Sequence, residues 1–233
     1  MPQHEPLSPP LLLIASVLAA QPAAWLALAA DAVVAGAVGA LAGIPWGGLS
    51  FTHGFIVRPV QASGGQLPAV VWTVVLLAGP VGTAALGLAA HFLAEGTGAA
   101  AWLRVPALQW GSFALLRLPA LVFAGVAPGG RGPVNELYSR LGEPQSGRWS
   151  LAPLAVLALG GVATVVVRRS VATGREWMRL DGREFRSRLV RVLGGYPSLV
   201  SLVVWCVLAP WAAPVWMAGW LLLTLASMHV LVS

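Results

Sequence analysis

The sequence predicts an all-α integral membrane protein with about six transmembrane helices and a basic amphipathic segment on the cytoplasmic side. Several apolar runs reach about 20 residues, the length a helix needs to cross the hydrocarbon core. Only 9% of the 233 residues are charged, whereas soluble domains have about 25%. Arginines cluster in one segment between apolar runs, as is typical of a cytoplasmic loop.

Changes in hydropathy divide the chain into four parts. We predict an N-terminal tail with a short apolar helix over 1–22, a four-span membrane core over 23–167, a basic cytoplasmic loop over 168–196 and C-terminal membrane helices over 197–233. Gln21-Pro22 interrupts the apolar pattern. Two alternatives stay open: Leu11–Ala20 is a separate interfacial helix, or it begins one long kinked helix that continues to Ile44.

The first predicted span of the core, Ala23–Ile44, is built largely from glycine and alanine and holds Asp31 near its middle. Small residues at helical spacing let helix backbones approach closely. A carboxylate at this depth costs about 2.5–3.5 kcal/mol on insertion scales, so it faces protein or water. We therefore expect this helix to be central and wrapped by others.

The remaining core elements follow from turn signals and apolar runs. The loop Pro45–Gln66 has weak strand character over Leu49–Val60, which predicts a hairpin at the membrane surface. We predict further spans at Leu67–Glu95, which contains Gly79-Pro80, then at Ala107–Val126 and Leu151–Val167, and two more membrane elements at Pro197–Ala209 and Pro214–Val232.

Arginine bias sets the predicted orientation. The segment Arg168–Gly195 holds eight arginines against three acidic residues, so we expect it in the cytoplasm, with both termini on the same side of a bacterial inner membrane. Its apolar residues recur at roughly helical intervals, which predicts an amphipathic helix on the anionic membrane surface. Docking to an acidic partner is the alternative, and nucleic acid binding is not expected. The arginines are Arg168, Arg169, Arg175, Arg179, Arg183, Arg186, Arg188 and Arg191.

Asp31 and Arg117 form the first candidate site, because both lie near the middle of spans predicted to run in the same direction. Opposite charges at one depth favour pairing, since an isolated charge there is costly. We predict a buried ion pair or a shared polar pocket. Its role is either structural, fixing helix packing, or functional, as a proton or ion relay or a substrate site.

Histidines give the second set of candidates. His91 and Glu95 are four residues apart and share one helix face, but a metal site needs three or four ligands. His91 and His229 lie in or near spans, where a tetrapyrrole could take an axial imidazole. A lone histidine packed against protein is the simpler interpretation. We therefore predict no metal and no cofactor.

Three segments together resemble the core of the site-2-protease family of intramembrane zinc metalloproteases. They are LALAADAVVAGAVGALAGIPWGGLSF, LLAGPVGTAALGLAA (Leu76–Ala90) and FAGVAPGGRGPVNELYSRLG (Phe123–Gly142). The resemblance implies a metalloprotease fold that has lost its zinc. The family's two histidines and its glutamate match Asp31, Ala35 and Ala32, and the third segment keeps Pro128 but has no Asp, so none of the family's functional residues carries over.

These observations favour a non-catalytic integral membrane subunit or scaffold of a larger complex, such as an energy-converting or photosynthetic one. Its expected partners are other membrane subunits and anionic lipid. Two alternatives stay open: an atypical intramembrane hydrolase of site-2-protease type, and a small ion or proton transporter that uses Asp31 and Arg117. No catalytic residues are assigned.

Overall fold

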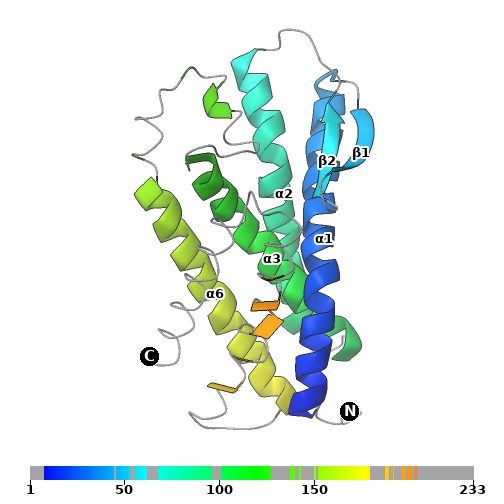
Figure 1. Cartoon of the computed structure of the whole chain (residues 1–233), viewed down its shortest axis with the longest axis vertical. Helices are drawn as coiled ribbons and strands as arrows, with labels where there is room; N and C mark the ends of the chain where they lie inside the picture. The colour runs from blue at the N-terminus through cyan, green and yellow to red at the C-terminus, as the bar shows by residue number, and fades with distance from the viewer. Residues whose placement is uncertain are drawn as a thin grey trace.

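The computed structural model describes four long helices and a hairpin (Figure 1). The elements are α1 (Pro9–Leu41), β1 (Trp46–Thr52), β2 (Ile56–Gln61), α2 (Ala69–Glu95), α3 (Ala101–Val126) and α6 (Ala152–Met178). The described residues are 8–44, 46–52, 56–61, 68–95, 101–126 and 152–178, with the short pieces 137–139, 142, 150, 187–188, 191, 196–197, 199–200 and 203.

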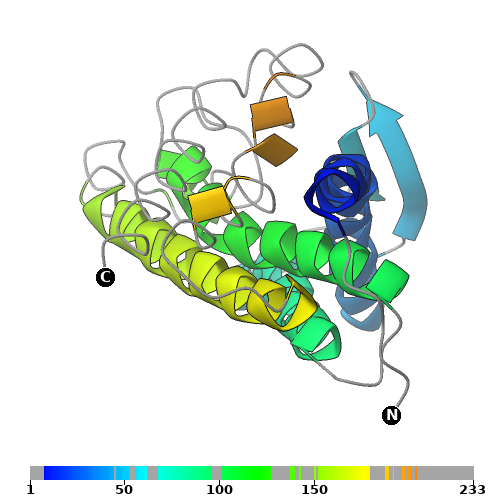
Figure 2. The same ribbon diagram turned by 90° about the horizontal axis from the view of Figure 1, so that it is seen from below.

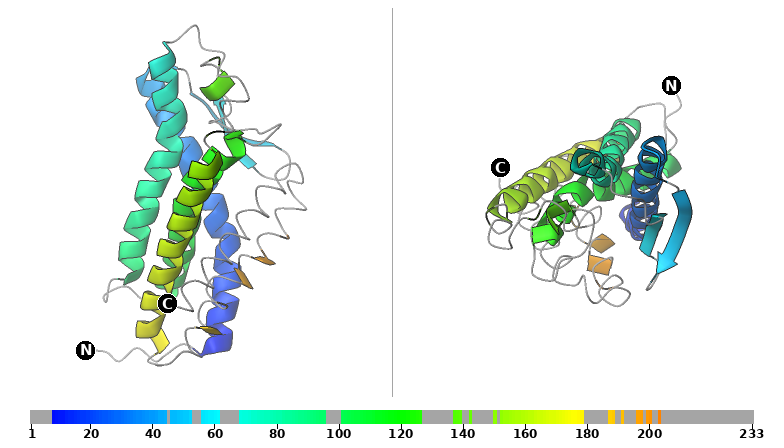
Figure 3. Two further views of the ribbon diagram at one scale, coloured as in Figure 1. Left: turned by 90° about the vertical axis from the view of Figure 1, so that its left-hand side faces the viewer. Right: turned by 90° about the horizontal axis from the view of Figure 1, so that it is seen from above.

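The long helices pack as a bundle in which α1, α2 and α3 contact one another and α6 contacts mainly α3. In Figure 1, α1 and α3 run upward while α2 and α6 run downward. Seen from below (Figure 2) and from above (Figure 3), the hairpin lies on the far side of α1 from α6. The first three helices therefore enclose a common interior.

Among the described residues, three helices are long and apolar enough to cross a membrane, namely Pro10–Leu41, Val70–Glu95 and Pro153–Thr173. The α-helical membrane class is thus what the structure supports. Helix α3 carries Arg104 and Arg117 and is not among the three. The two predicted C-terminal elements lie largely outside the described residues, so the total of about six spans stays a prediction.

Helix α1 resolves the alternative left open at Gln21-Pro22, because one helix passes through both residues. In hydrocarbon no water can satisfy free backbone groups, so a continuous helix is favoured even across a proline. The predicted boundary after residue 22 therefore falls inside α1.

The C-terminus of α1 is closed by backbone hydrogen bonds. The Ile44 N–H donates to the Gly39 carbonyl at 2.9 Å, and the Gly43 N–H donates to the Ala40 carbonyl at 3.0 Å. Gly43 has a φ of 80°, a left-handed conformation that glycine adopts without strain. This turn directs Ile44 into a buried cluster with Trp72, Val75 and Leu76 of α2.

The hairpin predicted within Pro45–Gln66 is present. Strands β1 and β2 pair in antiparallel fashion from Thr52 opposite Ile56 to Trp46 opposite Gln61, with an irregularity between Trp46 and Leu49. Both strands contact α1, so the hairpin lies alongside the helix that precedes it.

The structure corrects two further predictions. Helix α3 begins at Ala101 rather than Ala107, so Pro106 lies within its first turns. Helix α6 continues well past Val167 to Met178, which places Arg168, Arg169 and Arg175 on the helix and moves the predicted boundary of the basic loop. An amphipathic continuation of the span explains this, because arginines extend a helix beyond the apolar core without breaking it.

The first span, predicted to be central and wrapped by others, contacts α2, α3 and both strands, but among the described helices it is not the one with the most helix neighbours. Helix α3 contacts α1, α2 and α6, whereas α1 leaves large apolar side chains such as Leu18 and Leu26 exposed. The polar residues of α3 explain its position, because charged groups in a membrane need protein around them.

Candidate functional site

One face of α1 lines the interior of the bundle. Its buried residues recur every three or four positions, which keeps them on one side of the helix. Three of the six residues in this stripe are alanines, which let the other helices approach. The stripe consists of Leu12, Ser16, Ala20, Ala24, Ala27 and Asp31.

Asp31 ends this stripe in an ion pair with Arg117 of α3. The Asp31 Oδ2 atom accepts a hydrogen bond from Arg117 Nε at 3.1 Å and a second, shorter one from Arg117 Nη2. The two side chains are only 12% and 17% exposed, respectively. The pairing expected from the sequence is therefore present, and it joins α1 to α3.

Gly79 of α2 packs directly against this ion pair. A Cβ atom at this position would collide with Asp31 Oδ1, and it would lie 2.6 Å from the Asp31 carbonyl oxygen and 3.2 Å from Ala35 Cβ. Three residues later, a Cβ on Gly82 would lie 2.7 Å from Val34 Cγ1. Glycine is required here because α1 and α2 are in backbone contact.

The two oxygens of Asp31 have different environments. While Oδ2 accepts both bonds from Arg117, Oδ1 is buried and has no hydrogen-bond partner among the described residues. It faces the space beside Gly79. The ion pair is thus satisfied on one side only.

Helix α2 presents a second stripe to the interior, made of residues at four-residue intervals. It consists of Gly79, Thr83, Gly87, His91 and Glu95. At its middle, α2 and α3 cross closely, because a Cβ on Gly87 would lie 2.7 Å from Ala114 Cβ, and one on Gly111 would lie 2.7 Å from the Gly87 carbonyl oxygen. Small residues make this crossing possible.

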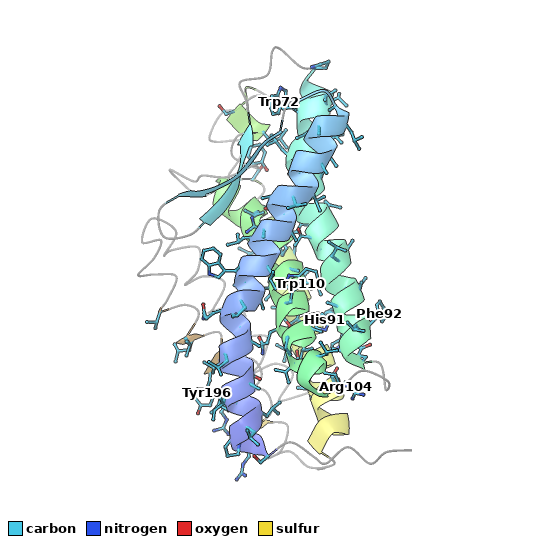
Figure 4. The ribbon with its side chains drawn as sticks, turned by 90° about the vertical axis from the view of Figure 1, so that its right-hand side faces the viewer. Trp72, His91, Phe92, Arg104, Trp110 and Tyr196 are labelled. Carbon is cyan, nitrogen blue, oxygen red and sulfur yellow. The ribbon has the colours of Figure 1, made fainter. Side chains whose placement is uncertain are left out.

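His91 is fully buried next to the crossing. A Cβ on Gly111 would lie 2.8 Å from His91 Cδ2, so the imidazole packs against α3. Neither Nδ1 nor Nε2 has a partner among the residues that the structure describes. In Figure 4, His91 lies within the bundle while Phe92 points outward. The Nε1 atom of Trp110 is also buried without a partner in the described part of the chain.

Glu95 does not pair with His91 in the way their spacing suggested. It accepts a hydrogen bond from Arg169 Nη1 of α6 at 3.1 Å, and the same guanidinium lies over the Phe92 ring at 4.9 Å. The Glu95 and Arg169 side chains are 34% and 31% exposed. The charge on Arg169 provides a stronger attraction than a neutral imidazole, which explains the difference.

The other predicted site residues are distributed as follows. Within the described residues no group of three or more His, Cys, Asp or Glu side chains could hold a metal ion. His229 lies outside the described residues, as do Arg179, Arg183 and Arg186. Arg168, Arg188 and Arg191 are exposed, and Arg191 donates to Ser187 Oγ at 2.6 Å.

Sequence reasoning missed Ser16, Thr83 and Trp110, and it missed Arg169 as the partner of Glu95. The four-residue repeat on α2 was a usable signal for Thr83, because it lies on the same helix face as Gly79 and His91. Nothing in the sequence joined Glu95 to Arg169, which are far apart along the chain.

Comparisons with protein-family models, with curated proteins and with solved structures find no match to this chain. The resemblance to the site-2-protease family therefore stays a prediction.

Proposed function

We propose that this chain is a non-catalytic integral membrane subunit or scaffold of a larger membrane complex. The observation that carries the proposal is the pairing of Asp31 with Arg117. A buried pair of this kind fixes how α1 and α3 pack, because either charge alone would be costly in the interior. The hydrolase alternative stays open.

The outer faces of the bundle fit this role. Large apolar side chains such as Val74, Leu93 and Leu157 are exposed, and lipid or the helices of other subunits would cover them. The basic residues near the end of α6 suit anionic lipid. The arginine bias supports an orientation with both termini in the cytoplasm of a bacterium.

Cross-linking in the native membrane, followed by purification in mild detergent, tests this proposal. We expect defined partner subunits to copurify in fixed stoichiometry. A protein that remains monomeric and without cross-linked neighbours would count against the assembly role. Metal analysis of the same sample tests the resemblance, since bound zinc in stoichiometric amount would contradict a fold that has lost its metal.

A second candidate function is proton transfer at Asp31. The specific observation that favours it is the buried Oδ1 atom, which has no partner among the described residues while Oδ2 is held by Arg117. A carboxylate with one free oxygen can accept a proton without leaving its partner. Proton flux in liposomes that is unchanged by Asp31→Asn would exclude it.

A further inference from the structure

Helix α6 carries two consecutive arginines whose surroundings differ. Arg169 faces α2, because it donates to Glu95 at 3.1 Å. Arg168 is exposed. The other carboxylate whose side chain the structure describes is Asp31, and it pairs with Arg117. Arg168 therefore adds one positive charge that no described carboxylate balances.

These arginines lie at the level where two helices leave the hydrocarbon. Helices α2 and α6 both run downward in Figure 1. Arg168 is the first charged residue of α6 and follows the uncharged run Ala152–Val167. This run is about 24 Å long at about 1.5 Å per residue, close to the hydrocarbon core of about 30 Å. Glu95, the partner of Arg169, is the last residue of α2. From this boundary, the long stem of an arginine lets its guanidinium reach the lipid phosphates.

Toward the middle of the membrane, the face of α6 that carries Arg168 is apolar and uncovered. Val165, Gly161 and Leu157 precede Arg168 at helical spacing, which keeps them on the same side of the helix. All three are exposed. A Cβ atom on Gly161 would meet nothing within 4 Å, so the helix backbone itself is accessible at this point. We call Leu157, Gly161, Val165 and Arg168 the outer face of α6.

A phospholipid matches this outer face in length and in charge. From Leu157 to Arg168 the helix rises about 17 Å at about 1.5 Å per residue, and one leaflet contributes about 15 Å of hydrocarbon. An acyl chain therefore covers the apolar part while the phosphate of the same molecule lies at the guanidinium. Hydrogen bonds between arginine and phosphate are charge-assisted and strong. One net negative charge balances Arg168, as in a phosphodiester whose headgroup has no ammonium.

Helix α6 is also placed where lipid reaches it. It contacts mainly α3 and lies at the edge of the described bundle (Figure 2). A protein partner on the outer face would have to bring an acidic side chain to the level of the phosphates and an apolar surface beside it. The bilayer supplies both in one molecule.

We propose that the outer face of α6 binds one anionic phospholipid, with its phosphate at Arg168 and an acyl chain along Val165, Gly161 and Leu157. This inference rests on the contact with anionic lipid proposed above and makes it a single defined site. Arg169 has its charge balanced by Glu95 and positions α6 against α2. Zwitterionic lipids bind the site less well, because their ammonium group is repelled by Arg168.

Photo-cross-linking in liposomes tests the site. The full-length protein is reconstituted in phosphatidylcholine with a trace of phosphatidylglycerol that carries a diazirine in one acyl chain, and labelled peptides are mapped by mass spectrometry. We expect more label on the outer face of α6 than on α1, where Leu18 and Leu26 are similarly exposed but no arginine is present. Phosphatidylcholine with the same diazirine should label the two helices alike.

Arg168→Gln decides between a defined site and a general attraction of the basic segment for lipid. It should lower the phosphatidylglycerol label on α6 about fivefold, which corresponds to about 1 kcal/mol for one basic residue near anionic lipid. Arg191→Gln is the matched control, because Arg191 is also exposed and belongs to the same basic segment but lies outside α6. It should leave the label on α6 unchanged. Both side chains are exposed, so neither substitution removes a buried contact.

The remaining outcomes contradict the site. An equal loss in both variants would show a diffuse attraction, which keeps the lipid contact proposed above and overturns the single site. Label spread equally over α1 and α6 by both lipids would show ordinary bilayer contact. Displacement of the label by millimolar inorganic phosphate would show that an anion alone is recognised. An unlabelled α6 that cross-links to another protein in the native membrane would assign this face to a protein partner.

The site and the assembly role fail in different measurements. A labelled α6 in a protein that copurifies with no partner subunits would keep the lipid site and count against the assembly role. Defined partners together with label that does not depend on Arg168 would overturn the lipid site alone.

Discussion

Within the described part of the chain, the ion pairs Asp31–Arg117 and Glu95–Arg169 each join two helices, and they differ in where they lie. Asp31 and Arg117 join α1 to α3 in the interior, at 12% and 17% exposure, whereas Glu95 and Arg169 join α2 to α6 at 34% and 31% exposure. The chemistry is the same in both, a carboxylate with a guanidinium. The surroundings decide what each pair contributes.

The interior pair is surrounded by helix backbones. Gly79 touches Asp31, and α1, α2 and α3 meet around it. The other pair has Phe92 as a neighbour through a cation–π contact, and its side chains are about one-third exposed. Removing one partner leaves a buried charge in the first case and a solvated one in the second, so the two pairs should respond very differently to substitution.

The largest expected effect is that of breaking the interior pair. Asp31→Asn leaves the Arg117 guanidinium buried without its counter-charge, so the free energy of unfolding in detergent should fall by about 3–5 kcal/mol. Denaturant unfolding followed by circular dichroism measures this. Combining it with Arg117→Met should recover a large part of the loss, because no buried charge then remains. If Asp31→Asn alone were as stable as the wild type, the Asp31–Arg117 pair would have to be hydrated like the Glu95–Arg169 pair.

Backbone contact around the interior pair gives the next largest effect. Gly79→Ala introduces a Cβ that would collide with Asp31 Oδ1, which should cost about 1–3 kcal/mol as overpacking does in cores. Thermal unfolding of the purified protein reports it. Gly160→Ala in α6 is the matched control, since nothing lies within 4 Å of a Cβ built there. Equal behaviour of the two variants would contradict the close approach of α1 and α2.

The sequence predicted the interior pair and could not predict the outer one. Asp31 and Arg117 are conspicuous because a charge within an apolar run needs a partner, and few are available. Arg169 belongs to a segment with many arginines, so its partner cannot be chosen from composition. The same limit applies to Ser16 and Thr83, because a hydroxyl on a helix normally bonds to its own backbone and carries no signal.

The helices and strands can likewise be divided into features that the sequence predicted and features that it did not. Apolar length predicted the helices of the membrane core, and turn residues predicted the hairpin. Helix ends were less predictable at Pro22, Pro106 and Arg168, where a residue that ordinarily marks a boundary lies inside a helix. At the two prolines a continuous helix keeps most backbone groups bonded within the helix, which hydrocarbon cannot do, and this requirement outweighs the local signal. At Arg168 the helix continues because arginines extend it beyond the apolar core without breaking it.

The smallest expected effect belongs to the outer pair. Glu95→Gln removes the charge that Arg169 faces, but both side chains are about one-third exposed, and such pairs contribute about 0.2–1 kcal/mol. Arg169 also keeps its contact with Phe92. The free energy of unfolding in detergent should therefore differ little between Glu95→Gln and the wild type. That small difference should disappear at high salt, where exposed pairs are screened. A loss as large as that from Asp31→Asn would mean that lipid shields the Glu95 end as fully as the helices shield the interior, and the two pairs would then be equivalent.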